Sequence, residues 1–176
     1  MSSSAVPLPF DRAVIADMKP LMAYETAKFI HILGVIILLG NVTATAIWKF
    51  FADRSKDPKI VGFGQRLVTL TDWSLTVWGA GLTMVGGYAA AAIGQLDLLS
   101  ERWLVLGQGL FVLSGALWLG ILVPLQVRMA RMAREFQSGD TIPDAYWRAS
   151  RTWFVVGLAI TVPLVAAAWV MVSKAY

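Results

Sequence analysis

Four long apolar stretches constrain this sequence more than any other feature, because each is long enough to cross a membrane. They cover about residues 24–48, 69–93, 103–127 and 152–173. Crossing roughly 30 Å of hydrocarbon takes about 20 helical residues. The stretches lack the short alternating pattern of barrel strands, so helices are the alternative that satisfies the backbone within the bilayer. The sequence therefore predicts an all-α, polytopic integral membrane four-helix bundle.

The composition excludes several other classes of protein. Of the 176 residues, 57% are hydrophobic and 15% are charged, against about 45–50% and about 25% in soluble domains. Cysteine is absent, which excludes disulfides, thiolate metal sites and iron–sulfur clusters. The single histidine, His31, also excludes a multi-histidine site within one chain. We therefore expect neither a soluble enzyme nor a metal site built from these residues.

The loop charges predict an orientation. Ten of the fifteen Lys and Arg residues lie in the links between spans one and two and between spans three and four. Positively charged loops remain in the cytoplasm, so both termini are expected outside, in the periplasm, for a protein of the bacterial inner (plasma) membrane. Basic loops against anionic lipid headgroups account for the net charge of +4 without a nucleic-acid partner.

The division of the chain follows from the same pattern. Residues 1–22 are expected to form an N-terminal periplasmic tail, with a short helix over 13–18 that ends before Pro20. Residues 23–176 are expected to form the transmembrane domain. The short link at 94–102 predicts that the second and third spans are antiparallel neighbours.

Small and polar residues recur at spacings of three and four along three of the spans, as they do where membrane helices meet. Two interpretations remain open: simple helix packing with interhelical hydrogen bonds, or the lining of a cofactor or substrate cavity. The stripes are His31, Gly34, Leu38, Asn41 and Thr45 on the first span, Asp72, Thr76, Gly79, Thr83, Gly86 and Ala90 on the second, and Gln108 and Gly115 with Ser114 and Gly107 on the third.

His31 is the first candidate functional residue, because an ionisable group inside a span is a functional hypothesis by default. Its ring should point into the bundle, since imidazole facing hydrocarbon would leave its nitrogens without partners. Counting from the outer ends places Met84, Tyr88, Gln108 and Trp169 at a similar depth. His31 with Met84 could ligate a b-type haem, with Tyr88 or Gln108 orienting the ring or a substrate. The alternative is a structural imidazole that makes an interhelical hydrogen bond.

Asp72, near the inner end of the second span, is the second candidate. A carboxylate at that depth should find a basic partner or stay protonated, and Arg66, Arg128 and Arg151 lie near the same level. This polar cluster is either a structural ion pair or a site for an anionic group such as a porphyrin propionate or a quinone headgroup.

A resemblance to known families rests on the first span. The segment KFIHIL at residues 28–33, with Gly34, Gly40-Asn41 and IWK at 47–49 beyond it, resembles a bacterial family known as predicted integral membrane proteins of unknown function, from about Tyr24 onward. The Lys-x-x-His opening is also similar to the J-type protoporphyrinogen oxidase and to the membrane domain of copper-resistance protein D. The latter two resemblances imply that His31 takes part in cofactor chemistry.

Three functions are compatible with these features. The favoured one is a non-enzymatic accessory subunit that packs in a larger membrane complex or as a homo-oligomer, through the small faces of the second span. The alternative is a haem-binding redox protein or a protoporphyrinogen-oxidase-like enzyme that uses His31. A small transporter or copper-uptake protein is disfavoured, because the chain shows no inverted repeat and no acidic midplane site.

Overall fold

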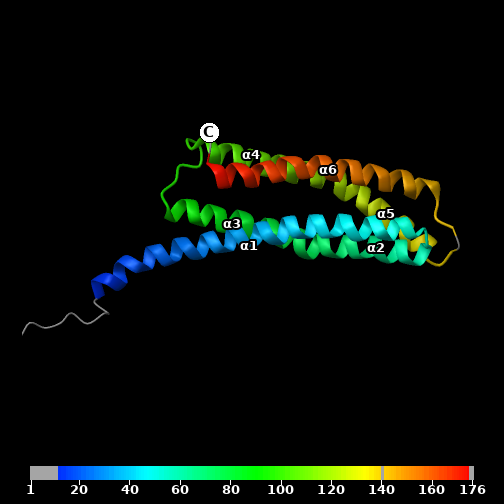
Figure 1. The fold of residues 1–176 in the computed structure, drawn as a ribbon, viewed down its shortest axis with the longest axis horizontal. Coiled ribbons are helices and arrows are strands. Elements are labelled where there is room, and N and C mark those ends of the chain that lie inside the picture. Colours follow the sequence, from blue (N-terminus) through cyan, green and yellow to red (C-terminus); the bar gives the residue numbers. More distant parts are fainter. Residues whose placement is uncertain (1–11, 140, 175–176) are drawn as a thin grey trace, which may run out of the picture.

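The computed structural model describes residues 12–139 and 141–174, with side chains from Met18 onward. Within these ranges the chain forms four long helical segments and no strand (Figure 1). Two of the segments contain a short π-helical turn. The segments are α1 (Arg12–Ser55); α2 (Pro58–Thr71) with η1 (Asp72–Thr76) and α3 (Val77–Ile93); α4 (Arg102–Leu117) with η2 (Trp118–Leu122) and α5 (Val123–Phe136); and α6 (Asp144–Ser173).

All four segments are long and apolar enough to cross a membrane, which confirms the prediction of four spanning helices. The candidate spans are Met18–Ser55, Pro58–Ile93, Arg102–Phe136 and Asp144–Ser173, and each contains one of the stretches expected from the sequence. The helices continue beyond those stretches where the basic residues lie. A helix can continue beyond the apolar stretch when its residues form an amphipathic pattern, with one face packed against other helices and the other face in contact with water.

The start of α1 differs from the expectation. The chain is helical from Arg12 and continues through Pro20, so the helix does not end before this proline. A proline removes one backbone donor from the ladder, and the turns on both sides of Pro20 still form. No structural break marks the expected boundary between residues 22 and 23, and residues 1–11 lie outside the described residues.

The helices form two pairs that converge at one end. α1 packs along α3 and α2, α4 packs along α6, and α5 contacts α2. We call the end with the links at 56–57 and 137–143 the Lys49 end, and the end with the link at 94–101 and the described C-terminus the His31 end. In Figure 1 the two pairs approach each other at the Lys49 end and diverge towards the His31 end.

The second and third spans are antiparallel neighbours, as expected, and they pack against each other at the Lys49 end, where α2 contacts α5. Towards the His31 end they separate. Among the described residues α3 makes no backbone contact with α4 or α6, so the pair α1/α3 stands apart from the pair α4/α6 at the His31 end. Asp97 forms local hydrogen bonds within the link between α3 and α4. Its side chain accepts from the Ser100 hydroxyl and from the Leu99 N–H. These hydrogen bonds lower the pKa of Asp97.

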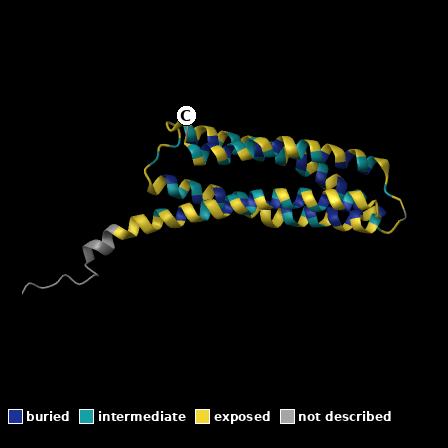
Figure 2. Ribbon diagram, in the orientation of Figure 1, coloured by how far each residue is buried: buried dark blue, intermediate teal, exposed yellow. Residues whose placement is uncertain are grey.

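The buried core lies at the Lys49 end, where Figure 2 shows buried residues on all converging helices. Most of the outer surface is apolar, as expected for helices in contact with lipid. The core side chains include Val61, Val68, Met129, Phe136, Tyr146 and Trp153. Exposed large side chains include Phe29, Ile36, Phe51, Trp78 and Leu158.

Glycine brings α1 and α3 into close contact, and the first two stripes face each other as predicted. A Cβ on Gly34 would lie 2.8 Å from the Gly79 carbonyl oxygen, and one on Gly79 would lie 2.9 Å from the Leu38 nitrogen. The third stripe has a different neighbour. Ser114 donates a hydrogen bond of 3.2 Å to the Ile160 carbonyl oxygen on α6, and Gly115 has open space beside it.

Candidate functional site

His31 points into the bundle, as the sequence predicts. Its Nδ1 lies 2.7 Å from the backbone carbonyl oxygen of Thr83 on α3. A carbonyl oxygen can only accept, so Nδ1 carries the hydrogen, and in the neutral ring Nε2 keeps its lone pair. Gly87 provides the space for the ring, because a Cβ there would lie 2.8 Å from Nδ1. The ring is therefore fixed by α3 with one nitrogen left for a ligand.

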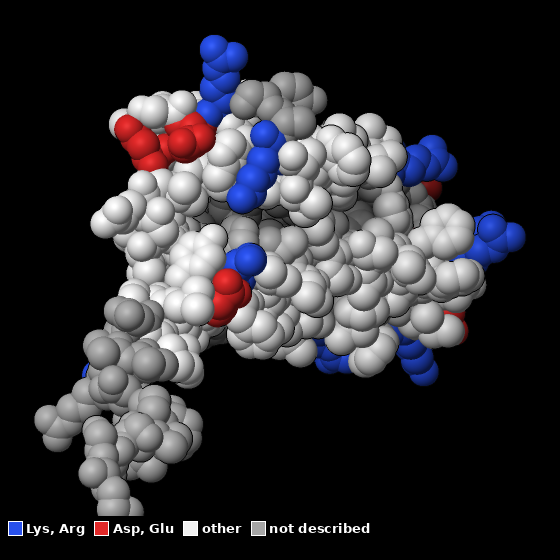
Figure 3. All heavy atoms as spheres, turned by 60° about the vertical axis from the view of Figure 1, so that its left-hand side comes forward, with Lys and Arg blue, Asp and Glu red and all other residues white. Residues whose placement is uncertain are grey.

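A cavity of about 600 Å³ lies beside His31, between the diverging pairs α1/α3 and α4/α6. Figure 3 looks towards this end of the molecule and shows a hollow bordered mainly by uncharged atoms, with a few charged side chains near it. Four of the five residues expected at one depth, His31, Met84, Tyr88 and Gln108, line this cavity. The fifth, Trp169, does not line it and is 67% exposed, so its side chain faces outward. The structure thus brings these candidate residues together around one space.

The walls of the cavity are mostly apolar, and its polar groups are few. Ile32, Phe111, Leu164 and Met171 contribute apolar surface. Gln108 is fixed by its Nε2, which donates to the carbonyl oxygens of Leu98 (3.0 Å) and Leu104 (3.1 Å). Binding sites for small molecules combine such apolar walls with a few fixed polar groups.

Two lysines line the cavity near the helix ends. Lys28 lies 3.9 Å from Glu25 in an exposed ion pair, and its Nζ is 5.8 Å from the centre of the Tyr24 ring. Lys174 lies over the Trp103 ring, with Nζ 5.2 Å from its centre. Both cations are available at the surface, so an anionic group at the cavity mouth would be attracted to them.

Asp72 does not have the arginine partners that we expected. Its carboxylate accepts hydrogen bonds from Asn41 Nδ2 (3.0 Å), Thr76 Oγ1 (3.1 Å) and Gln126 Nε2 (2.8 Å). In the described part of the chain, no ion pair joins Asp72 to an arginine. The three expected partners, Arg66, Arg128 and Arg151, are exposed.

The physical reason for this difference is the direction of the side chains. Asp72 is only 6% exposed and faces the interior, whereas long arginine side chains extend to the headgroup region where they stay hydrated. Neutral amides can satisfy a carboxylate from within the bundle. The sequence contained a signal for one partner, since Asn41 lies on the small and polar stripe of the first span. Gln126, a polar residue inside the third apolar stretch, was the second signal.

A second polar network, which the sequence analysis missed, surrounds Lys49. Lys49 is one of the ten cations that the loop-charge prediction places in the links, but its side chain is 0% exposed. Its Nζ lies 2.8 Å from Asp53 Oδ2 and donates to Tyr146 OH (3.0 Å) and Ser150 Oγ (3.3 Å). Tyr146 in turn donates to Gln65 Oε1 at 3.3 Å. The spacing of four from Asn41 through Thr45 to Lys49 was a signal that Lys49 faces inward.

The described residues contain no group of three His, Cys, Asp or Glu side chains that could hold a metal ion. The two polar networks join α1, α2, η1, α5 and α6 through hydrogen bonds and one ion pair. The cavity at the other end is the place where a ligand could be enclosed.

Comparison with known proteins decides the family. Residues 25–175 match the model of a family described as "Predicted integral membrane protein (DUF2269)". The chain belongs to this family. No curated protein and no solved structure matches the chain significantly. Membership of the DUF2269 family agrees with the four spanning helices and makes the protein a multi-pass integral membrane protein.

Proposed function

We propose that this DUF2269 protein binds a small, largely apolar molecule with an acidic group in the cavity beside His31. The observation that carries the proposal is the position of the imidazole, which is held by the Thr83 carbonyl oxygen at the wall of a cavity of about 600 Å³. Ligand pockets of about 300–1,000 Å³ with apolar walls enclose molecules of the size of a typical cofactor.

The lining suggests how such a ligand would be oriented. Its apolar body would lie among side chains such as Phe111, Leu164 and Met171, and its acidic group would lie towards Lys28 and Lys174. Attraction between an acid and these cations is stronger near a membrane, where the surroundings have a lower dielectric constant than water. Tyr88 would add a hydroxyl to the same space.

We propose b-type haem as this ligand. Metal-ligating histidines usually donate their other ring N–H to a carbonyl or carboxylate, and His31 makes such a hydrogen bond to Thr83. Met84 and Met171 line the same cavity and offer a thioether as a second ligand. Haem would supply one-electron chemistry, while the protein would supply the ligands, the apolar enclosure and the cations for the propionates.

Absorbance of the protein purified in a mild detergent tests this proposal, before and after hemin is added. We expect a Soret band that is lost in His31→Ala and retained in Phe29→Ala, a matched control on the same helix whose side chain faces outward. A Soret band that persists in His31→Ala would exclude haem ligation by His31. Failure of the wild-type protein to retain either hemin or any other small molecule, as followed by native mass spectrometry, would contradict the broader proposal.

An accessory role in a larger complex, or as a homo-oligomer, is the second candidate. Two glycines of the second span, Gly79 and Gly86, are used inside the chain at the contact of α3 with α1, whereas Gly81 has open space beside it. Gly109 and Gly120 of the third span are exposed and also have open space beside them, which is where a helix of a partner could approach closely. Crosslinking in the membrane through these two positions would detect such a partner.

The proposed location is the bacterial inner membrane, with both termini on the outer side. The basic residues of the links at the Lys49 end support this orientation through the positive-inside rule. In this orientation the ligand cavity opens towards the periplasmic side.

A further inference from the structure

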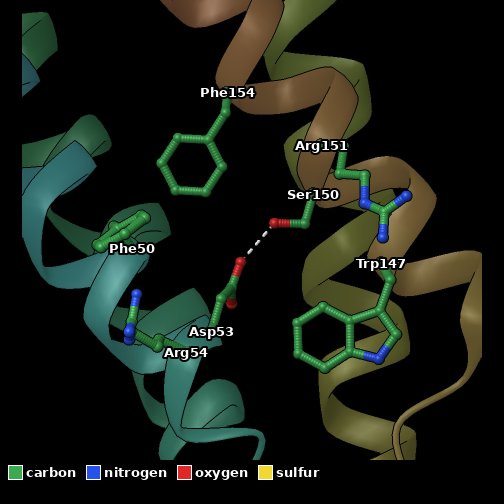
Figure 4. Close-up of a pocket in the computed structure, with 7 residues that line it drawn as sticks. All are labelled: Phe50, Asp53, Arg54, Trp147, Ser150, Arg151 and Phe154. Atoms are coloured by element: carbon green, nitrogen blue, oxygen red, sulfur yellow. Dashed lines mark hydrogen bonds between the residues drawn. The ribbon is translucent and has the colours of Figure 1, made fainter.

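A groove runs between α1 and α6 at the Lys49 end, far from the ligand cavity. It has a volume of about 250 Å³. Figure 4 shows Phe50 and Arg54 on the α1 side, and Trp147, Arg151 and Phe154 on the α6 side. α1 meets α6 over only a short length, which leaves the groove open to the surroundings of the bundle.

The two arginines of the groove lack an acidic partner. In the described part of the chain the ion pairs are Lys28 with Glu25 and Lys49 with Asp53, so neither Arg54 nor Arg151 is neutralised by a carboxylate there. Asp53 also lines the groove, but its negative charge is compensated by Lys49 Nζ at 2.8 Å. Two guanidinium groups therefore give this groove a net positive charge.

The remaining surface of the groove is aromatic. The rings of Phe50 and Phe154 lie edge to face, with centres 6.5 Å apart, and Trp147 lies on the same side as Arg151 (Figure 4). Aromatic residues, tryptophan above all, are enriched where a membrane helix leaves the hydrocarbon for the headgroup region. The groove thus combines a cationic part and an apolar part at the level of the lipid headgroups.

We propose that this groove is a binding site for an anionic phospholipid. Arg54 and Arg151 lie on opposite sides of the groove (Figure 4), so each guanidinium group reaches the anionic headgroup from its own helix. The aromatic rings cover the upper part of the acyl chains. Basic pockets between membrane helices bind anionic headgroups in this way. Free phosphate would leave the aromatic surface uncovered, so the lipid is the occupant that uses the whole groove.

Native mass spectrometry of the full chain in detergent tests the proposal, with phosphatidylglycerol and phosphatidylcholine as probes. A contact with a basic side chain near a membrane surface corresponds to about a fivefold change in affinity. We therefore expect Arg54→Gln and Arg151→Gln each to weaken phosphatidylglycerol binding about fivefold, and the double variant about 25-fold. Arg148→Gln is the matched control, because it removes an exposed arginine from the same helix outside the groove.

The outcomes separate the possible occupants. Selective loss of phosphatidylglycerol binding in the groove variants, with binding retained in Arg148→Gln, supports the lipid site. Equal loss in Arg148→Gln would mean that net charge alone attracts the lipid and would overturn the proposal. Displacement of the lipid by inorganic phosphate at the same concentration would instead show a simple anion site. Unchanged thermal unfolding of the variants, whose arginines are exposed, shows that they are folded.

Discussion

Lys49 and Asp53 form an ion pair inside the helical bundle, with Nζ and Oδ2 2.8 Å apart. The two residues lie one turn apart on α1, and the pair is completed from α6. Lys49 donates to Tyr146 and Ser150, and the Ser150 hydroxyl donates to Asp53. A buried charge pair contributes to stability only when further hydrogen bonds satisfy both ions. The pair therefore joins α1 to α6 at the end where the bundle is most closely packed.

Removal of the Lys49 charge should be strongly destabilising. Lys49→Met keeps the length of the side chain but leaves the Asp53 carboxylate, only 12% exposed, without its cation. Loss of one partner from a buried pair costs about 3–5 kcal/mol. We expect a clearly lower melting temperature in detergent, followed by circular dichroism, and partial recovery in the double variant Lys49→Met/Asp53→Asn. Lys59→Met, an exposed lysine at the same end, should unfold like the wild type.

Variants of Asp72 and of the nearby arginines test whether neutral side chains or arginines stabilise the Asp72 carboxylate. Asp72→Asn would place an amide N–H among the donors Asn41 and Gln126 and leave at least one donor unpaired, which costs about 1–3 kcal/mol. Arg66→Gln and Arg128→Gln should change the free energy of unfolding by less than about 0.5 kcal/mol, because both side chains are exposed. Denaturant unfolding of the three variants measures these differences. A large effect of either arginine variant would show that the arginine stabilises the carboxylate after all.

The fold could be predicted largely from the sequence, because hydropathy reports membrane spans directly. The length and apolar character of the stretches predict four helices, and small residues predict the contact between α1 and α3. The inward direction of His31 also followed from a local argument, the cost of an unpaired imidazole. Each of these features depends on residues close together in the chain.

The predictions that were wrong concern contacts between residues that are far apart in the sequence. The partners of Asp72 come from α1, the π-helical turn η1 and α5, and counting residues from helix ends gives depth but not the facing direction. A π-helical turn adds a residue to one turn and rotates the face that follows. Such turns, η1 and η2, interrupt both the second and the third segments. Lys49 was missed for a different reason, because it lies on the continuous helix α1 and was assigned to a loop only because it follows the apolar stretch.

Close packing of α1 on α3 predicts a contrast between two glycines of α3. A Cβ on Gly86 would lie 2.8 Å from His31 Cα and 2.9 Å from the Ala27 carbonyl oxygen, whereas none of the surrounding atoms lies within 4 Å of a Cβ on Gly81. Gly86→Ala should therefore separate the helices at a cost of about 1–3 kcal/mol. Gly81→Ala should be neutral or stabilising by up to about 1 kcal/mol, since alanine favours the helix. Equal thermal stability of the two variants would show that the helices adjust without cost.

The orientation can be tested with single cysteines, because the natural chain has none. Ser100 lies in the link at the His31 end, and Ser55 and Ser138 lie at the Lys49 end; all three are exposed. The positive-inside rule places the Lys49 end in the cytoplasm. In intact cells an impermeant maleimide should therefore label Ser100→Cys, and should label Ser55→Cys and Ser138→Cys only after the membrane is permeabilised. The reverse labelling pattern would contradict the proposed orientation. It would place the cavity beside His31 at the cytoplasmic side of the membrane and the groove of Arg54 and Arg151 in the outer leaflet.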